Sequence, residues 1–93
     1  MNPPGGAATQ ICSHRFDRRF LALPANLQER IQRQIDELGM NLRGFPHHRM
    51  QGVNAFRLRV GDYRVIYEFN AERNELHLIT VGHRREIYKE GFN

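Results

Sequence analysis

The sequence predicts an α+β domain in which a helical hairpin packs on a small twisted antiparallel sheet. In the first half of the chain, apolar residues recur every three to four positions, as on one face of a helix. In the second half they recur every two positions, as in strands. The expected order is β-α-α-β-β-β with a short C-terminal segment. A length of 93 residues fits one domain.

The N-terminus carries the weakest pattern. Residues 1–8 are rich in Pro, Gly and Ala, so a disordered lead-in is expected there, and the single domain spans residues 9–93. Thr9–His14 alternates weakly and is a candidate first strand. Cys12 on this strand is interpreted as a core residue. A lone cysteine excludes an internal disulfide and favours a reducing, cytoplasmic location.

Two helices should form the hairpin. Arg15–Leu23 carries Phe16 and Phe20 on one face, and Pro24 ends it, because proline disfavours the α conformation in the preceding residue. Asn26 is the expected N-cap of the second helix. Glu29 is its expected capping-box partner. The apolar stripe of this helix consists of Leu27, Ile31, Leu42 and either Ile35 or Leu38. Gly39 or Gly44 should end the helix.

Three strands follow a loop at Gly44–Val53. They are Ala55–Val60, Tyr63–Phe69 and Glu75–Val81. In the last of them, Leu76 and Leu78 alternate with His77, Ile79 and Val81. Because Gly-Asp is a two-residue hairpin signal, the first two strands should turn at Gly61-Asp62 and form an antiparallel meander with the third.

This hairpin predicts a cluster of like charges. Val60 should face Tyr63, which places Arg59 opposite Arg64 and Arg57 on the same face as both. Like charges directly opposite each other are unfavourable in a sheet. An anion held through paired hydrogen bonds would relieve the repulsion. A face with arginines splayed into solvent is the alternative.

A second basic cluster follows the last strand. Gly82 should end that strand and turn the chain toward the hairpin end that holds Arg59 and Arg64, so the two clusters should converge. Arg84, Arg85 and Tyr88 belong to this second cluster. Tyr88 could equally be an ordinary half-buried aromatic residue, and His83 a solvated turn histidine.

The net charge of +4 and a pI near 10.0 favour nucleic acid or an acidic protein as partner, although a merely soluble basic surface also fits. No apolar run is long enough to span a membrane, and no signal peptide is evident. His47-His48 has no third ligand at metal spacing, so no metal site is expected. His14 and His77 are interpreted as structural.

The motifs FRLRVGDYRVIY (56–67) and VGHRREIY (81–88) resemble the RelE branch of the RelE/ParE toxin superfamily. The resemblance extends over residues 9–90. It implies a type II toxin that enters the ribosomal A site and cuts mRNA there, by attack of the 2′-hydroxyl on the adjacent phosphate. The reaction leaves a cyclic phosphate and a free 5′-hydroxyl, needs no cofactor or metal, and inhibits translation.

The resemblance also implies residue roles. Arg64 and Arg84 match the arginines that grip the scissile phosphate, and Tyr88 matches the tyrosine that stacks on or orients the nucleotide. Arg57 and Arg59 occupy positions held by lysines in the best-known relative, as does His83. The expected catalytic residues are therefore Arg64, Arg84, Tyr88, Arg59 and His83. The expected RNA-binding residues are Arg57, Arg59, Arg85 and Lys89.

Proton transfer is the step on which the residues differ from that relative. Arginine is almost never a general base, because its pKa exceeds about 12. Arg57 and Arg59 therefore do not suit that role. Histidine is the side-chain type that most often transfers protons near neutral pH, so His83 is the candidate for this role.

The resemblance leaves two alternatives open: a ParE-like poison of DNA gyrase, or a non-catalytic relative that binds an antitoxin. Tyr88 together with Arg64 and Arg84 favours the RNase, because gyrase poisons generally lack this combination. The expected partners are a cognate acidic antitoxin that folds on binding, the ribosome and its mRNA, and operator DNA only through the toxin–antitoxin complex.

Overall fold

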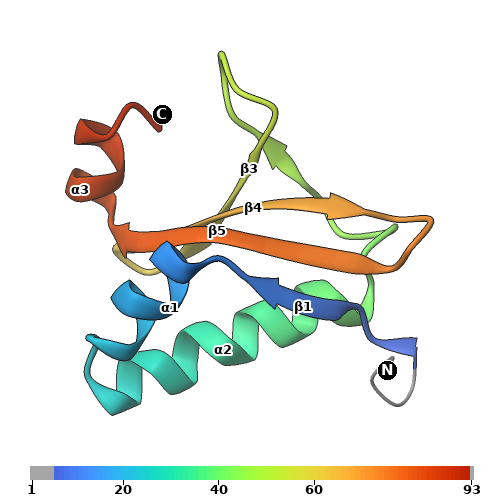
Figure 1. Ribbon diagram of the computed structural model, residues 1–93, viewed down its shortest axis with the longest axis horizontal. Helices are drawn as coiled ribbons and strands as arrows, with labels where there is room; N and C mark the ends of the chain where they lie inside the picture. Colours follow the sequence, from blue (N-terminus) through green and yellow to red (C-terminus); the bar gives the residue numbers. More distant parts are fainter. Residues whose placement is uncertain (1–5, 93) are drawn as a thin grey trace.

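The computed structural model describes residues 6–92. One five-stranded sheet has the order β1-β5-β4-β3-β2 (Figure 1). Its strands are β1 (Thr9–Cys12), β2 (His48–Arg49), β3 (Phe56–Val60), β4 (Tyr63–Asn70) and β5 (Glu75–His83). The helices are α1 (His14–Leu21), α2 (Ala25–Met40) and α3 (Arg84–Lys89). The predicted fold class and the three-strand meander are confirmed.

The sheet is mixed, which corrects the expectation of a purely antiparallel one. β1 pairs in parallel with β5, in register from Thr9 opposite Glu75 to Cys12 opposite Leu78. The other three pairings are antiparallel. Cys12 is exposed, so its interpretation as a core residue was wrong. The alternation of a short strand does not specify its partner, and an edge strand leaves part of its side chains in solvent.

The loop predicted at Gly44–Val53 contains β2. His48 pairs with Arg57 and Arg49 with Phe56. Two residues are too few to show an alternating pattern, so the sequence gives no strand signal there.

Both helices begin at residues other than those predicted. α1 starts at His14, because the Ser13 hydroxyl caps it by accepting a hydrogen bond from the Phe16 N–H at 3.0 Å. α2 starts at Ala25 with Pro24 as its N-cap, so Asn26 lies inside the helix. It ends at Met40, with Asn41 as its C-cap, rather than at either glycine that the sequence suggested.

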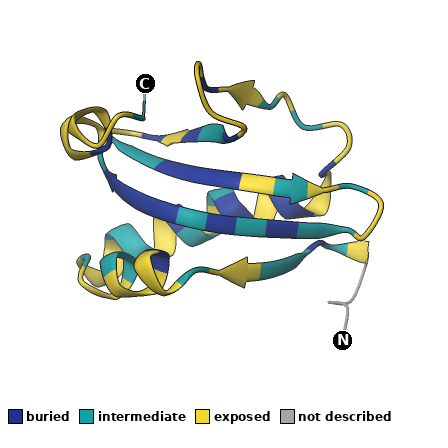
Figure 2. Ribbon diagram, turned by 45° about the horizontal axis from the view of Figure 1, so that its top comes forward, coloured by how far each residue is buried: buried dark blue, intermediate teal, exposed yellow. Residues whose placement is uncertain are grey.

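Two apolar clusters pack on the sheet, which has α1 and α2 on one side and α3 on the other (Figure 1). Figure 2 shows the buried residues that run along β4 and β5 between them. The larger cluster packs α1 and α2 against one face. Its fully buried members include Phe16, Ile31, Ile35, Leu38, Val65, Tyr67, Leu76, Leu78 and Val81. The smaller cluster joins α3 and the β2–β3 loop to the other face through Met50, Ala55, Ile66 and Ile87. Both faces of β4 are therefore covered in its middle.

A register shift changes the predicted faces of β5. Alternation places Val81 on the same face as Ile79, whereas the structure places Val81 in the larger cluster with Leu78. The shift lies between Ile66 and Tyr67 of β4. One extra residue in β5 reverses the alternation beyond it, as a β-bulge does.

The predicted disordered lead-in lies partly outside the described residues, which begin at Gly6. Ala8 is buried, and its N–H donates to the Gly39 carbonyl at 2.9 Å. This backbone contact holds the chain against the end of α2 directly before β1.

Candidate functional site

The β3–β4 hairpin has the predicted register. Val60 lies opposite Tyr63 and Arg59 opposite Arg64. The turn begins at Gly61, whose φ of +58° is readily adopted by glycine. The hairpin therefore places two arginines side by side at one end of the sheet.

β5 brings the second basic cluster to the same end. Gly82 does not break the strand as predicted. It lies within β5 opposite Arg64, and the Arg84 N–H donates to the Asp62 carbonyl at 2.7 Å. Ile87 of α3 packs over this part of β5, since its Cδ1 would lie 3.4 Å from a Cβ at Gly82. The predicted convergence of the two clusters is confirmed.

Helix α3 begins with a capping box. The His83 side chain accepts from the Arg85 N–H at 3.2 Å, and Glu86 accepts from the His83 N–H at 3.2 Å. Ile87 anchors the helix in the smaller apolar cluster. One residue on, Tyr88 is 70% exposed.

Basic side chains line an open cavity of about 410 Å³ between the sheet and α3. Its lining residues are Arg57, Arg59, Arg64, Arg84, Arg85, Ile87, Tyr88, Lys89 and Phe92. Seven of the predicted site residues thus line one cavity. Ile87 and Phe92 were not predicted as site residues, although apolar residues among charged ones near the C-terminus were a usable signal.

The cavity has little negative charge to balance its arginines. Burial lowers the pKa of Arg64, and the neighbouring Arg59, Arg57 and Arg84 lower it further. Within residues 6–92, no carboxylate lies within 4.0 Å of the guanidinium nitrogens of Arg57, Arg59 or Arg64. The cavity is therefore an electropositive site that a bound anion would stabilise.

Two lining arginines are held by the hairpin itself. Nη1 of Arg64 donates to the Gly61 carbonyl at 2.8 Å and the Tyr63 carbonyl at 2.9 Å. Nε of Arg84 lies 3.9 Å from a carboxylate oxygen of Asp62. The Arg64 contacts both start from Nη1, so its other nitrogens can turn toward an anion.

His83 does not line this cavity. Its ring meets Tyr63 edge to face, with the centroids 5.6 Å apart, and its Nδ1 accepts the capping hydrogen bond. The proton-transfer candidate thus occupies a capping position beside the arginines.

His47 has a structural place in the larger core. Its Nε2 lies 2.6 Å from the Leu42 carbonyl, so this nitrogen carries the proton. Its Nδ1 lies 2.7 Å from the Tyr67 hydroxyl, and its ring stacks on Phe69. The part of the chain that the structure describes holds no group of three or more His, Cys, Asp or Glu side chains arranged for a metal. None of its helices is both long and apolar enough to cross a membrane.

Comparison with known structures shows the same architecture. A crystal structure of the RelB–RelE antitoxin–toxin complex from Methanococcus jannaschii matches with a TM-score of 0.66 and 26% identity, over 86% of this chain and 96% of that one. The isolated RelE toxin of E. coli matches with a TM-score of 0.72 and 20% identity, over 91% and 95%. An archaeal RelE–RelB complex from Pyrococcus horikoshii matches with a TM-score of 0.68 and 21% identity, over 84% and 96%.

Sequence comparison identifies the family. No curated protein matches. A family model described as the ParE toxin of the type II toxin–antitoxin system parDE matches residues 11–88. The chain therefore belongs to this family of type II toxins, within the RelE/ParE superfamily, and it has the fold of the RelE toxins.

Proposed function

We propose that this toxin is a ribosome-dependent endoribonuclease that cleaves mRNA in the A site. The observation that supports it is the convergence of Arg57, Arg59, Arg64 and Arg84 on one cavity, beside the exposed ring of Tyr88. Guanidinium groups pair with phosphate through parallel hydrogen bonds, and an aromatic ring stacks on a base.

The reaction follows the chemistry of RNA itself. The 2′-oxygen attacks the adjacent phosphorus, and the bond from phosphorus to the 5′-oxygen breaks. The 2′-hydroxyl loses a proton and the leaving 5′-oxygen gains one, which gives a cyclic phosphate and a free 5′-hydroxyl. Negative charge builds on the phosphate oxygens during the attack.

The arginines supply charge stabilisation. Arg64 and Arg84 hold the scissile phosphate, while Arg57 and Arg59 complete the positive wall. Preorganised donors aimed at developing charge commonly contribute factors of about 10²–10³ in rate each. Arginine stays protonated, so these residues bind and stabilise and do not accept the proton. Arg85 and Lys89 extend the positive surface along α3 toward the flanking RNA.

Tyr88 supplies orientation. It lies on α3 between Ile87, which is buried, and Lys89, which lines the same cavity. Stacking of its ring on a base contributes about 1–3 kcal/mol and holds the nucleotide in place. The 2′-oxygen is then kept in line with the leaving group.

The partners follow from charge and from the relatives. A chain of net charge +4 with an open arginine cavity suits an acidic antitoxin, and two of the similar structures are toxin–antitoxin complexes. In the cytoplasm, the toxin would act on translating ribosomes when the antitoxin is absent. Operator DNA would be contacted through the toxin–antitoxin complex.

A second candidate is poisoning of DNA gyrase, which the ParE description of the matching family favours. One pair of assays separates the two. mRNA 5′ ends are mapped by primer extension after in vitro translation with the purified chain, beside a tube of the same mRNA without ribosomes. Cuts inside codons only when ribosomes are present support the nuclease. Intact mRNA together with loss of gyrase supercoiling supports the poison.

A further inference from the structure

A smaller pocket adjoins the arginine cavity on the side of β2. It has a volume of about 170 Å³ and is lined by His48, Arg57 and Arg59. Two of these residues, Arg57 and Arg59, also line the larger cavity. The arginines on β3 therefore form a shared wall, with one pocket on each side of it.

The register of the sheet sets the geometry of this pocket. His48 lies directly opposite Arg57, so their side chains stand on the same face. Neighbouring strands lie about 4.8 Å apart, and Arg57 and Arg59 are separated by about 6.6 Å along β3. Both guanidinium groups are thus within a side-chain length of the imidazole.

We propose that this pocket binds a phosphate of single-stranded RNA that neighbours the scissile one, with His48 as its ligand. The inference rests on the proposed function, because it continues the same RNA strand across β3. An imidazole N–H donates a hydrogen bond to a phosphate oxygen, and a protonated ring adds a charge. The bound phosphate also relieves the repulsion between that charge and the two arginines.

The neighbouring residues agree with this assignment. Arg49, the next residue on β2, is turned elsewhere: its guanidinium carbon lies 5.3 Å from the centre of the Phe56 ring, and Nη1 donates to Asn54 at 3.0 Å. His48 is therefore the β2 side chain that faces the shared arginines.

The cavity at the other end of β4 and β5 has mixed charge. Its lining includes Arg49 of β2, but also Glu68 and His77, which lie opposite each other. Nε2 of His77 is 3.2 Å from the Glu75 carboxylate. Because carboxylates repel phosphate, the RNA strand is assigned to the pocket that His48 shares with Arg57 and Arg59.

The test is a binding experiment that needs no cleavage. Fluorescence anisotropy follows a short single-stranded RNA, with 2′-O-methyl groups that block the attack, on the full chain at pH 6 and pH 8 over a range of salt. His48→Ala should weaken binding about fivefold at pH 6 and less at pH 8. Because each phosphate contact on a single strand contributes about 0.7 to the slope of log affinity against log salt, the variant's slope at pH 6 should fall by about that amount.

Two further variants serve as controls: one removes a histidine outside the pocket, and the other replaces His48 with a residue whose charge does not change with pH. His77→Ala should bind as the unmodified chain does. His48→Arg should bind equally well at pH 6 and pH 8, because its charge does not titrate in this range.

The outcomes separate this inference from the proposed function. If Arg64→Ala weakens binding while His48→Ala leaves the affinity and the salt slope unchanged, the proposed phosphate site at His48 is wrong, and RNA binding in the arginine cavity is still supported. A greater loss in His77→Ala than in His48→Ala would also overturn it. If Arg64→Ala has no effect, the RNA does not use the cavity, and both proposals fail.

Discussion

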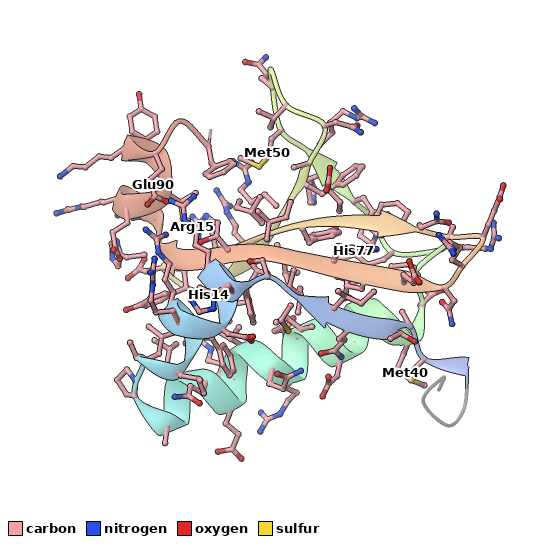
Figure 3. All side chains as sticks on the ribbon, in the orientation of Figure 1. His14, Arg15, Met40, Met50, His77 and Glu90 are labelled. Atoms are coloured by element: carbon pink, nitrogen blue, oxygen red, sulfur yellow. The ribbon has the colours of Figure 1, made fainter. Side chains whose placement is uncertain are left out.

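Glu90, at the end of α3, forms a bidentate ion pair with Arg19 of α1. The same carboxylate accepts from Nη2 of Arg15 at 2.7 Å, and Figure 3 labels Arg15 and Glu90 close to each other near the end of β5. Arg19 also donates to the Thr80 hydroxyl at 3.2 Å, which ties the pair to β5. The helix that carries Tyr88 is thereby fastened to the helical hairpin.

Glu90→Gln should destabilise the fold by about 1 kcal/mol, a value limited by the partial exposure of the pair. The hydrogen bond from Arg19, reinforced by Arg15, holds the pKa of Glu90 below its usual range. The stabilisation is therefore present above the unfolded-state value of about 4.3 and is lost as the pH falls through the lower folded value. Urea denaturation of both proteins at pH 7 and pH 3 measures the difference in the free energy of unfolding.

The matched control for this variant is Glu72→Gln, at an exposed position in the β4–β5 turn. It should leave the free energy of unfolding unchanged at both pH values. An equal loss of stability in both variants at pH 7 would show that the ion pair contributes nothing beyond general charge.

His83→Ala should lower the free energy of unfolding by about 1 kcal/mol, because it removes the hydrogen bond that the His83 side chain accepts in the capping box. His83→Asn restores a capping side chain without a group that titrates near neutrality. If His83 acts by capping, the asparagine variant should cut mRNA at the unmodified rate. A rate that stays low in the asparagine variant, with normal stability, would assign proton transfer to His83 instead. Primer extension and thermal denaturation of both variants decide the question.

Tyr67→Phe should destabilise the protein by about 1–2 kcal/mol, because Nδ1 of the partly buried His47 loses the hydrogen bond from the buried Tyr67 hydroxyl. Burial also raises the pKa of the Tyr67 phenol, so it stays protonated and able to donate. Tyr63→Phe is the control at a less buried position, where a smaller effect is expected. Equal losses from the two substitutions, measured by denaturant unfolding, would contradict the assignment.

Arg64→Ala should lower the rate of mRNA cleavage on the ribosome by about 10²–10³, because it removes a donor to the developing phosphate charge. The fold should be retained, since the lost hydrogen bonds run only to the carbonyls of Gly61 in the turn and Tyr63 at the start of β4. Arg33→Ala, at an exposed position of α2, is the matched control and should leave the rate unchanged. Primer extension on translating ribosomes gives both rates. Equal rates for the two variants would remove Arg64 from the reaction.

Much of this fold could be predicted because its signals are local. The helical period of α2 and the strand period of β3 and β4 reflect which side chains point toward the core. The Gly61-Asp62 turn sets the register of its two strands, and that register alone places Arg59 opposite Arg64. Arg57, Arg59 and Arg64 followed from that register, and Arg84, Arg85 and Tyr88 from the return of β5 to the same end of the sheet.

Only the tertiary structure decided the rest, because it depends on contacts between distant parts of the chain. The parallel partner of β1, the two-residue strand β2 and the register shift in β5 leave no mark on a local pattern. The same holds for Glu90, which meets Arg19 across 71 positions of the sequence. The hydrogen bond that His83 makes depends on the backbone of α3, which supplies its partner. In α2, β3 and β4 the sequence determined which side chains share a face, whereas long-range packing determined the faces of β5 beyond its extra residue and what each side chain touches.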